Sequence, residues 1–237
     1  QSSLQKTTTE TIGRLLPAGT ADAGSPRQLE NENRVFDTKL VTDIGPNKLS
    51  VGGQYLDASL VDGATPAPFT FEQWAVFAEN EWRINDALNL TLGARHDDHS
   101  RFGSHLSPRA YLVWNASPNW VVKGGYSEGY RSPNVEDLTP GIRGFGGQGT
   151  IPLIGTPGLQ PETSATTELG VYYAADNGVS ANLTVFNNDF DDKIASGTPV
   201  ANCAYGLSQE QYAAADFSGV DCYDAGWFPR SPTFGQS

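Results

Sequence analysis

Side chains alternate between apolar and polar over four consecutive segments of this chain. In the first segment, one set of alternate positions is largely apolar and the other carries Glu79, Glu81 and Arg83. The four segments are 74–84, 88–95, 109–115 and 120–126. A period of two is typical of a β-strand with one apolar and one polar face. Both a soluble β-sandwich and a membrane barrel have such strands, so the pattern predicts an all-β fold without deciding between them.

The links between these segments favour the membrane barrel. Two links, 84–87 and 116–119, are short and rich in turn-forming residues. We expect the links at the opposite strand ends to be long and polar. A transmembrane β-barrel has tight turns on one rim and long extracellular loops on the other. Aromatic side chains that suit membrane interfaces lie near the strand ends. They are Trp74, Trp82, Trp114, Trp120 and Tyr126.

Composition excludes some classes of protein and leaves the barrel open. The chain has 237 residues, of which 18% are charged and 38% hydrophobic, and its formal net charge is −12. No apolar run approaches the ~18 residues of a transmembrane helix, but barrel strands give a much weaker signal. The negative charge argues against binding to a nucleic-acid backbone, which needs clustered Lys and Arg. It fits the solubility of long loops.

Two motifs, GYRSP at 129–133 and LQPETS at 159–164, accompany the alternating segments. Together with the surrounding strands, residues 30–196 resemble the middle of the barrel of a TonB-dependent outer-membrane receptor. The resemblance is strongest to the ferric-catecholate siderophore and colicin receptor group. It implies an antiparallel transmembrane β-barrel of about 22 strands, of which about eight or nine are recognisable here, with two open edges.

The resemblance also implies a domain organisation. We expect one partial barrel domain over 1–237, with a strand end and loop in 1–32, strands and loops in 33–196, and an extracellular loop region in 197–237. Loops are expected at 14–32, 62–70, 96–105 and 130–164, and from 189 to the end. The chain begins at Gln1 without a Met, and the family's plug domain and TonB-contacting segment are not recognisable in it. We therefore expect a piece of a longer receptor.

Cys203 and Cys222 are the two cysteines of the chain. In an oxidising compartment we expect them to pair and staple the C-terminal loop region. The alternative is two unrelated thiols.

Two motifs have a chemical interpretation that their surroundings disfavour. GFGGQG at 144–149 matches a dinucleotide fingerprint, but prolines at 140 and 152 stand where a strand and a helix are needed, so we expect a flexible loop.

A histidine and aspartate cluster could ligate a metal, but a solvated surface loop is the better interpretation. Its residues are His96, Asp97, Asp98, His99 and His105. No catalytic constellation is recognisable, and we expect no enzyme activity.

Arginines in the expected loops are candidate ligand contacts. Ferric catecholates are anionic, and guanidinium groups pair with such oxygens and stack on aromatic rings. The candidates are Arg101, Arg131 and Arg143, with Tyr130, Phe145, Tyr205 and Trp227 available for stacking. For Tyr130 and Arg131, which belong to GYRSP, the alternative is that they hold the strand end together. A siderophore brings its own iron ligands, so no resident metal or cofactor is expected.

The function implied by the resemblance is uptake of a ferric siderophore across the bacterial outer membrane. Extracellular loops would capture the ligand, and the TonB complex, energised by the proton motive force, would open a path by pulling on the plug. Outer-membrane lipid and possible use by a colicin or phage complete the expected partners. A passive porin and, less favoured, a soluble β-sandwich binding module are the alternatives.

Overall fold

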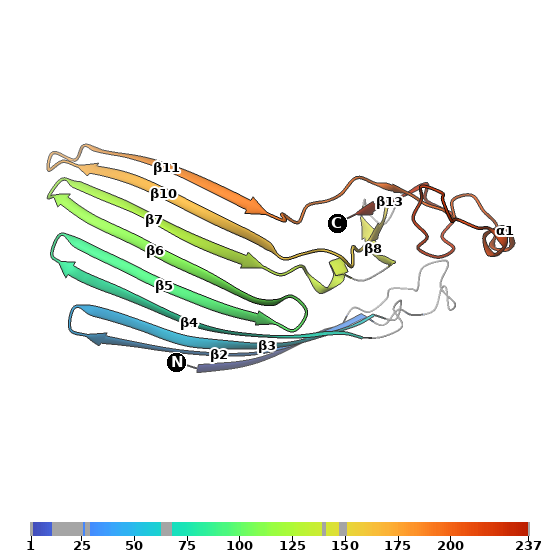
Figure 1. The fold of residues 1–237 in the computed structure, drawn as a ribbon, viewed down its shortest axis with the longest axis horizontal. Coiled ribbons are helices and arrows are strands. Elements are labelled where there is room, and N and C mark those ends of the chain that lie inside the picture. The colour runs from blue at the N-terminus through green and yellow to red at the C-terminus, as the bar shows by residue number, and fades with distance from the viewer. Residues whose placement is uncertain are drawn as a thin grey trace.

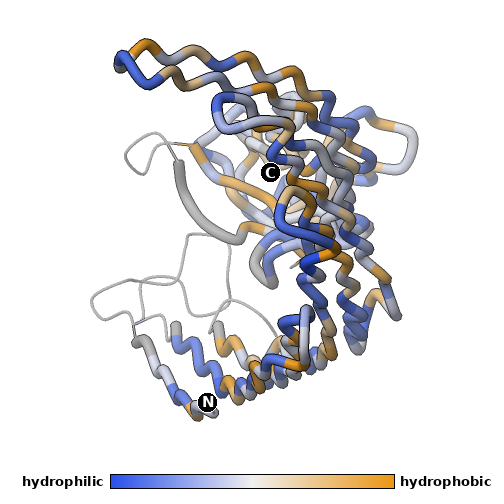
Figure 2. The backbone as a smooth tube through the Cα atoms, turned by 90° about the vertical axis from the view of Figure 1, so that its left-hand side faces the viewer, coloured by the Kyte–Doolittle hydropathy of each residue, from blue (hydrophilic) through white to orange (hydrophobic). Residues whose placement is uncertain are grey.

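Nine antiparallel strands form one sheet in the computed structural model, which describes residues 2–10, 26, 29–62, 68–138, 141–146 and 151–236. Neighbouring strands of this sheet are hydrogen-bonded to each other in the order β1-β2-β3-β4-β5-β6-β7-β10-β11. The strands are β1 (Ser2–Glu10), β2 (Leu29–Ile44), β3 (Asn47–Asp62), β4 (Phe69–Asn85), β5 (Leu88–His99), β6 (Gly103–Ser117), β7 (Trp120–Arg131), β10 (Glu162–Ala174) and β11 (Ser180–Asp191). Figure 1 shows one face of the sheet, and Figure 2 shows that the sheet is curved, like part of the wall of a barrel. The predicted all-β, antiparallel partial barrel is confirmed.

The convex face of the sheet carries rows of apolar side chains at matching register positions. One row runs from Trp82 through Leu90, Leu112 and Gly124 to Leu169. The large side chains Trp82, Leu112 and Leu169 of this row are exposed, and Leu169 keeps 55% of its surface accessible. Contiguous exposed apolar surface of this kind marks a face that another apolar phase covers, and lipid does so on a barrel.

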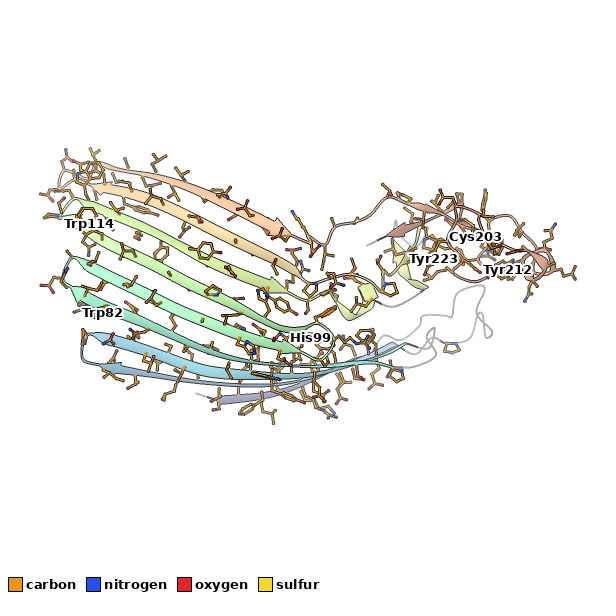
Figure 3. The ribbon with its side chains drawn as sticks, viewed as in Figure 1. Trp82, His99, Trp114, Cys203, Tyr212 and Tyr223 are labelled. Carbon is orange, nitrogen blue, oxygen red and sulfur yellow. A yellow bond between two sulfur atoms is a disulfide. The ribbon has the colours of Figure 1, made fainter. Side chains whose placement is uncertain are left out.

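Aromatic side chains border this apolar face. Trp82 and Trp114 lie near the short-turn end of the sheet (Figure 3), and Trp120 on the neighbouring strand packs its ring 4.7 Å from that of Tyr173. Trp74 lies on the same strand as Trp82, eight residues away, which is about 26 Å at the usual rise per residue. With a tilt of about 40° this distance covers about 20 Å of height, close to the ~25 Å apolar band of outer-membrane barrels.

The concave face is polar, and two of its glycines lie beneath aromatic rings. Gly52 pairs with Phe77 across β3 and β4, and Gly125 pairs with Tyr111 across β6 and β7. A Cβ atom at either glycine would collide with the ring of its partner. Each ring therefore covers backbone that a side chain would otherwise shield, a device that also fixes strand register.

Short turns join the strands at one end of the sheet, as predicted. The clearest is at residues 175–179, where Gly178 has a φ of +86° and Ala175 donates a backbone hydrogen bond to Val179 at 2.8 Å. The Asn177 side chain accepts from the Val179 amide at 3.2 Å. Glycine takes this positive φ without a Cβ penalty, which explains the Asn-Gly hairpin signal.

Several expected loops are wrong, because the strands continue further. β5 extends to His99 and β6 begins at Gly103, so the expected loop 96–105 is only a three-residue turn. The expectation that all the links at that end are long is therefore wrong. Residues 29–32, 162–164 and 189–191 also lie in strands. Above a membrane both faces of a strand meet water, so these strand ends have the polar composition of loops.

The expected C-terminal loop region is also wrong in part, because it is folded. β12 (Val200–Ala201) and β13 (Thr233–Gln236) join β9 (Ile151–Ile154) and β8 (Ile142–Gly146) in a second, four-stranded sheet. The 3-10 helix η1 (Val135–Leu138) precedes β8, and a short helix α1 (Gln209–Ala214) lies between β12 and β13. Ile154, Phe228 and Phe234 form the core of this unit, which we call the loop module. It lies beyond the strand ends opposite the short turns (Figure 1).

Among the described residues, no helix is long and apolar enough to cross a membrane.

Candidate functional site

A chain of hydrogen bonds and an ion pair crosses the concave face from β2 to β5. Gln54 donates to Asp37 at 2.7 Å, and Arg95 donates to Gln54 at 3.0 Å. Two nitrogens of the Arg95 guanidinium donate hydrogen bonds to the Asp97 carboxylate, each at 2.9 Å. The Gln73 side-chain amide donates a third hydrogen bond to Asp97 at 3.1 Å. Asp97 is buried, so its charge needs this bidentate partner. The arrangement gives the wall a hydrophilic surface on which Arg95 neutralises the charge of Asp97.

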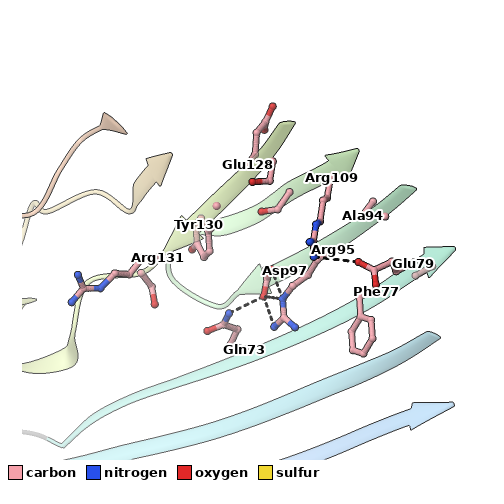
Figure 4. Close-up of a pocket in the computed structure, with 16 residues that line it drawn as sticks. Gln73, Phe77, Glu79, Ala94, Arg95, Asp97, Arg109, Glu128, Tyr130 and Arg131 are labelled. Carbon is pink, nitrogen blue, oxygen red and sulfur yellow. Dashed lines mark hydrogen bonds and ion pairs between the residues drawn. The ribbon is translucent and has the colours of Figure 1, made fainter. Parts of the chain in front are cut away.

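A hollow of about 580 Å³ lies beside this network, where β4 to β7 approach the loop end (Figure 4). The charged residues of its lining are Glu79, Arg95, Asp97, Arg109, Glu128 and Arg131. Arg109 reaches Glu79 at 3.5 Å. The volume is in the range of small-molecule sites, and Arg95 and Arg109 pair there with the carboxylates of Asp97 and Glu79.

Arg131 differs from the other two arginines of the hollow. Its side chain is exposed and extends away from the Arg95–Asp97 pair in Figure 4. It terminates β7, where its backbone pairs with Glu162 of the LQPETS motif. The two motifs of the sequence therefore meet at one strand end, and the Arg131 guanidinium faces solvent there.

Tyr130 contributes to the wall through its ring. The ring stacks on His105 of β6 with centroids 4.9 Å apart and planes 19° apart. The Tyr130 hydroxyl and the His105 Nε2 atom are both buried, and neither has a hydrogen-bond partner among the described residues. Tyr130 thus lines the hollow and also connects two strands, so both interpretations of this residue stand.

Arg101 lies in the turn between β5 and β6. Its guanidinium carbon is 3.7 Å from the ring centroid of Phe69, and its amide donates to Nδ1 of His99 at 3.1 Å. His99 is only 3% exposed, and its ring lies between those of Phe71 and Phe102 at 4.7 and 4.9 Å. Arg101 therefore stays at the rim, held over an aromatic ring.

The histidine and aspartate cluster does not converge on one point. His96 points to the convex face, where its ring packs 5.4 Å from Trp74, whereas Asp97 engages Arg95 on the concave face. Within the described residues, no group of three His, Cys, Asp or Glu side chains could hold a metal ion.

The loop module contains the disulfide that the sequence predicted. Cys203 and Cys222 are joined, with their Cα atoms 5.1 Å apart. Tyr205 nearby is 55% exposed and available to a ligand, whereas the Trp227 indole N–H is used internally, donating to the Leu207 carbonyl at 3.0 Å.

Asn202 organises this module, and no sequence signal indicated it. Its side-chain amide donates to the carbonyls of Phe228 and Ser231, both at 2.7 Å, and its oxygen accepts from the Ala204 amide at 2.9 Å. The residue is buried, with 6% of its surface exposed. An isolated Asn in a loop carries no pattern, so only the fold reveals its role.

Tyr212 of α1 has a raised pKa. Burial is the main cause and a hydrogen bond to Asp224 the second, and together they raise the pKa of Tyr212 to about 12. The hydroxyl donates to the Asp224 carboxylate at 2.5 Å.

Arg143 and Phe145 lie on β8, but their side chains are outside the described residues. The GFGGQG motif begins in the same strand: residues 144–146 belong to β8, so that part is not the flexible loop we expected, and 147–150 lie outside the described residues.

Comparison with known proteins decides the family. Residues 4–227 match the family described as TonB dependent receptor-like, beta-barrel. The chain belongs to this family. The family's relatives are outer-membrane receptors and not enzymes, and the chain accordingly lies in the outer membrane.

Two curated relatives illustrate the similarity. An iron-regulated outer membrane virulence protein of Vibrio cholerae is 41% identical over 189 residues, which cover 77% of this chain and 29% of the relative. A ferric enterobactin receptor of Pseudomonas aeruginosa is 36% identical over 149 residues, 60% of this chain and 20% of the relative. This chain therefore spans less than a third of the length of either relative.

Solved structures agree with the fold. A crystal structure of the ferric enterobactin receptor from Pseudomonas aeruginosa in complex with enterobactin matches 84% of this chain and 34% of its own, with 25% identity and a TM-score of 0.63. The siderophore receptor PirA from Acinetobacter baumannii matches with a TM-score of 0.60 and 24% identity.

Proposed function

We propose that this chain forms part of the wall and ligand-facing rim of an outer-membrane receptor that takes up a ferric siderophore of the catecholate class. The observation that carries the proposal is the exposed Arg131 guanidinium at the junction of the two family-like motifs. It stands above a wall in which Arg95 and Arg109 already pair with carboxylates. Among the described residues no carboxylate forms an ion pair with Arg131, so its guanidinium is available to an anionic ligand.

Relatives support the class of ligand. The curated names include ferric enterobactin receptors, and one similar solved structure contains enterobactin. A tris-catecholate complex is anionic and aromatic, so guanidinium and aromatic side chains suit it. Arg101, Arg131 and Tyr205 are the contacts we propose from the described side chains, with Tyr130, Arg143 and Phe145 as further candidates from the sequence.

The transport step rests on the family alone. We infer that a plug domain and the TonB complex act on the whole receptor, with energy from the proton motive force. Lipid would cover the apolar convex face, and a colicin or phage would use the same rim. The ion-paired concave wall would also suit a passive porin, but the relatives that are named as siderophore receptors favour ligand-specific uptake.

Tryptophan fluorescence of the full polypeptide in detergent tests the proposal. We expect saturable quenching by a ferric catecholate and none by a ferric hydroxamate or a cobalamin. Arg131→Ala should weaken catecholate binding by about tenfold to a hundredfold, because one lost charge-assisted contact is worth roughly 1.5–3 kcal/mol. Arg83→Ala is the matched control, since Arg83 lies among the last residues of β4, at the short-turn side, and should not alter binding.

Quenching by another ligand alone would overturn the catecholate assignment while leaving the receptor class. An absence of saturable quenching, together with ligand-independent ion conductance in a planar bilayer, would favour the porin instead. An unchanged affinity of Arg131→Ala would remove Arg131 from the site.

A further inference from the structure

The sheet is split between β6 and β7 at its loop end. The β6–β7 ladder stops at the pair Arg109–Ser127. The ladder on one side continues to His99–Gly103 between β5 and β6, and the ladder on the other continues to Arg131–Glu162 between β7 and β10. Residues 103–107 of β6 and 128–131 of β7 therefore face each other without a backbone ladder. We call this gap the seam.

Pro108 explains where the ladder stops. In an antiparallel sheet, successive residues direct their amides to opposite neighbours. The Asn115 amide donates to the Ala87 carbonyl on the β5 side at 2.7 Å, so the even-numbered residues of β6 direct theirs toward β7. Pro108 is even-numbered and is the first residue beyond the last β6–β7 pair. Because proline has no amide hydrogen, the ladder loses a donor here.

The β5–β6 turn is attached to β4 and not to β7. The Ser100 amide donates to the Glu72 carbonyl at 2.9 Å, and the Ser100 hydroxyl accepts from the Glu72 amide at 3.1 Å. Arg101 packs over Phe69 on the same strand. The β5–β6 turn, on one side of the seam, therefore moves with β4. The end of β7, on the other side, moves with β10.

A ring stack bridges the seam. His105 comes from β6 and Tyr130 from β7, and their rings stack across the gap at 4.9 Å. In the closed stack the Tyr130 hydroxyl and the His105 Nε2 atom are buried, and within the part of the chain that the structure describes neither has a hydrogen-bond partner. A buried polar atom without a partner loses its hydration and gains no hydrogen bond. Separating the rings would return both atoms to water, so the closed state carries a built-in cost.

We propose that the seam is a metastable closure of the extracellular rim, held by the His105–Tyr130 stack and able to open between β6 and β7. Opening widens the rim above the hollow and separates Arg101 from Arg131. The proposal concerns the wall and does not depend on which ligand the receptor takes, so it can fail while the proposed function stands.

Hydrogen exchange of the full polypeptide in detergent micelles, read by mass spectrometry, tests the sign of this effect. Tyr130→Phe keeps the ring and removes a hydroxyl that the closed state leaves unsatisfied. We expect exchange in 103–107 and 128–131 to slow about fivefold or more, since removing such a group relieves a penalty of roughly 1–3 kcal/mol. His105→Ala removes the stack and should accelerate exchange in the same segments.

Tyr126→Phe is the matched control on the same strand. The Tyr126 hydroxyl has a partner, Glu128, at 2.5 Å, so its removal should not slow exchange at the seam. Pro108→Ala restores an amide directed toward β7 and should slow exchange in 128–131 by extending the ladder.

Faster exchange in Tyr130→Phe would show that the hydroxyl has a partner in the closed state and would overturn the proposal. Equal slowing by Tyr130→Phe and Tyr126→Phe would overturn it as well. So would unchanged exchange in both Tyr130→Phe and His105→Ala, because the stack would then not hold the seam.

Discussion

Replacing Asn202 by leucine should loosen the loop module with little change in side-chain volume. The substitution removes three short hydrogen bonds, two to the carbonyls of Phe228 and Ser231 and one from the Ala204 amide. Each typical bond contributes about 0.5–1.5 kcal/mol net, and buried groups left without a partner cost more. The sum is about 3 kcal/mol of local stability, which corresponds to a roughly 150-fold larger open population.

Limited proteolysis of the full polypeptide in detergent measures this population. When opening is fast relative to cleavage, the rate of cutting within 197–236 follows the fraction of open module, so we expect a rise of about two orders of magnitude. Asp221→Asn in the same module changes an exposed side chain and should shift stability by less than about 0.5 kcal/mol. A cleavage rate for Asn202→Leu equal to that of Asp221→Asn would refute the reasoning.

Two further predictions concern other parts of the chain. Gly125→Val should sharply lower the yield of folded barrel, read as the heat-modifiable gel shift, because its Cβ would displace the Tyr111 ring; a normal yield would show that the ring can move aside. Tyr212 should ionise late in an absorbance titration, near its pKa of about 12, and Tyr212→Phe should remove that step. Because the fold raises this pKa, the stabilisation by neutral Tyr212 is complete below the ordinary value near 10 and is lost as pH rises through about 12. If the loop module of the wild type unfolded below pH ~10 while that of Tyr212→Phe stayed folded, this expected pH dependence would be wrong.

The sequence was sufficient to predict the membrane-spanning part of the sheet. Lipid on one side and polar groups on the other impose a period of two, and the positions Leu90, Leu112 and Leu169 fall on one face in the structure as the alternation requires. Beyond the membrane this constraint ends. His99 and its neighbours remain in a strand although their composition is that of a solvated loop.

The loop module could not be predicted for a different reason. Its core joins Ile154 to Phe228 and Phe234, which are distant in the chain and have no shared periodicity. The candidate site shows the same limit: the sequence indicated Arg101 and Arg131, but not that one lies over Phe69 while the other faces solvent. A local sequence pattern indicates on which face of a strand a side chain lies. The contacts of these loop residues depend instead on which loops come together in the fold.

The parallel pairing of β9 with β13 mechanically couples two connections of the barrel. β9 belongs to the segment between β7 and β10, and β13 follows β11, yet Leu153 and Gly235 are register partners. The Tyr223 hydroxyl also accepts from the Gly141 amide at 3.3 Å. A force that displaces one of these segments is therefore transmitted to the other through main-chain bonds. A ligand or protein that binds to one of these loops at the cell surface therefore displaces both loops together, as one rigid unit.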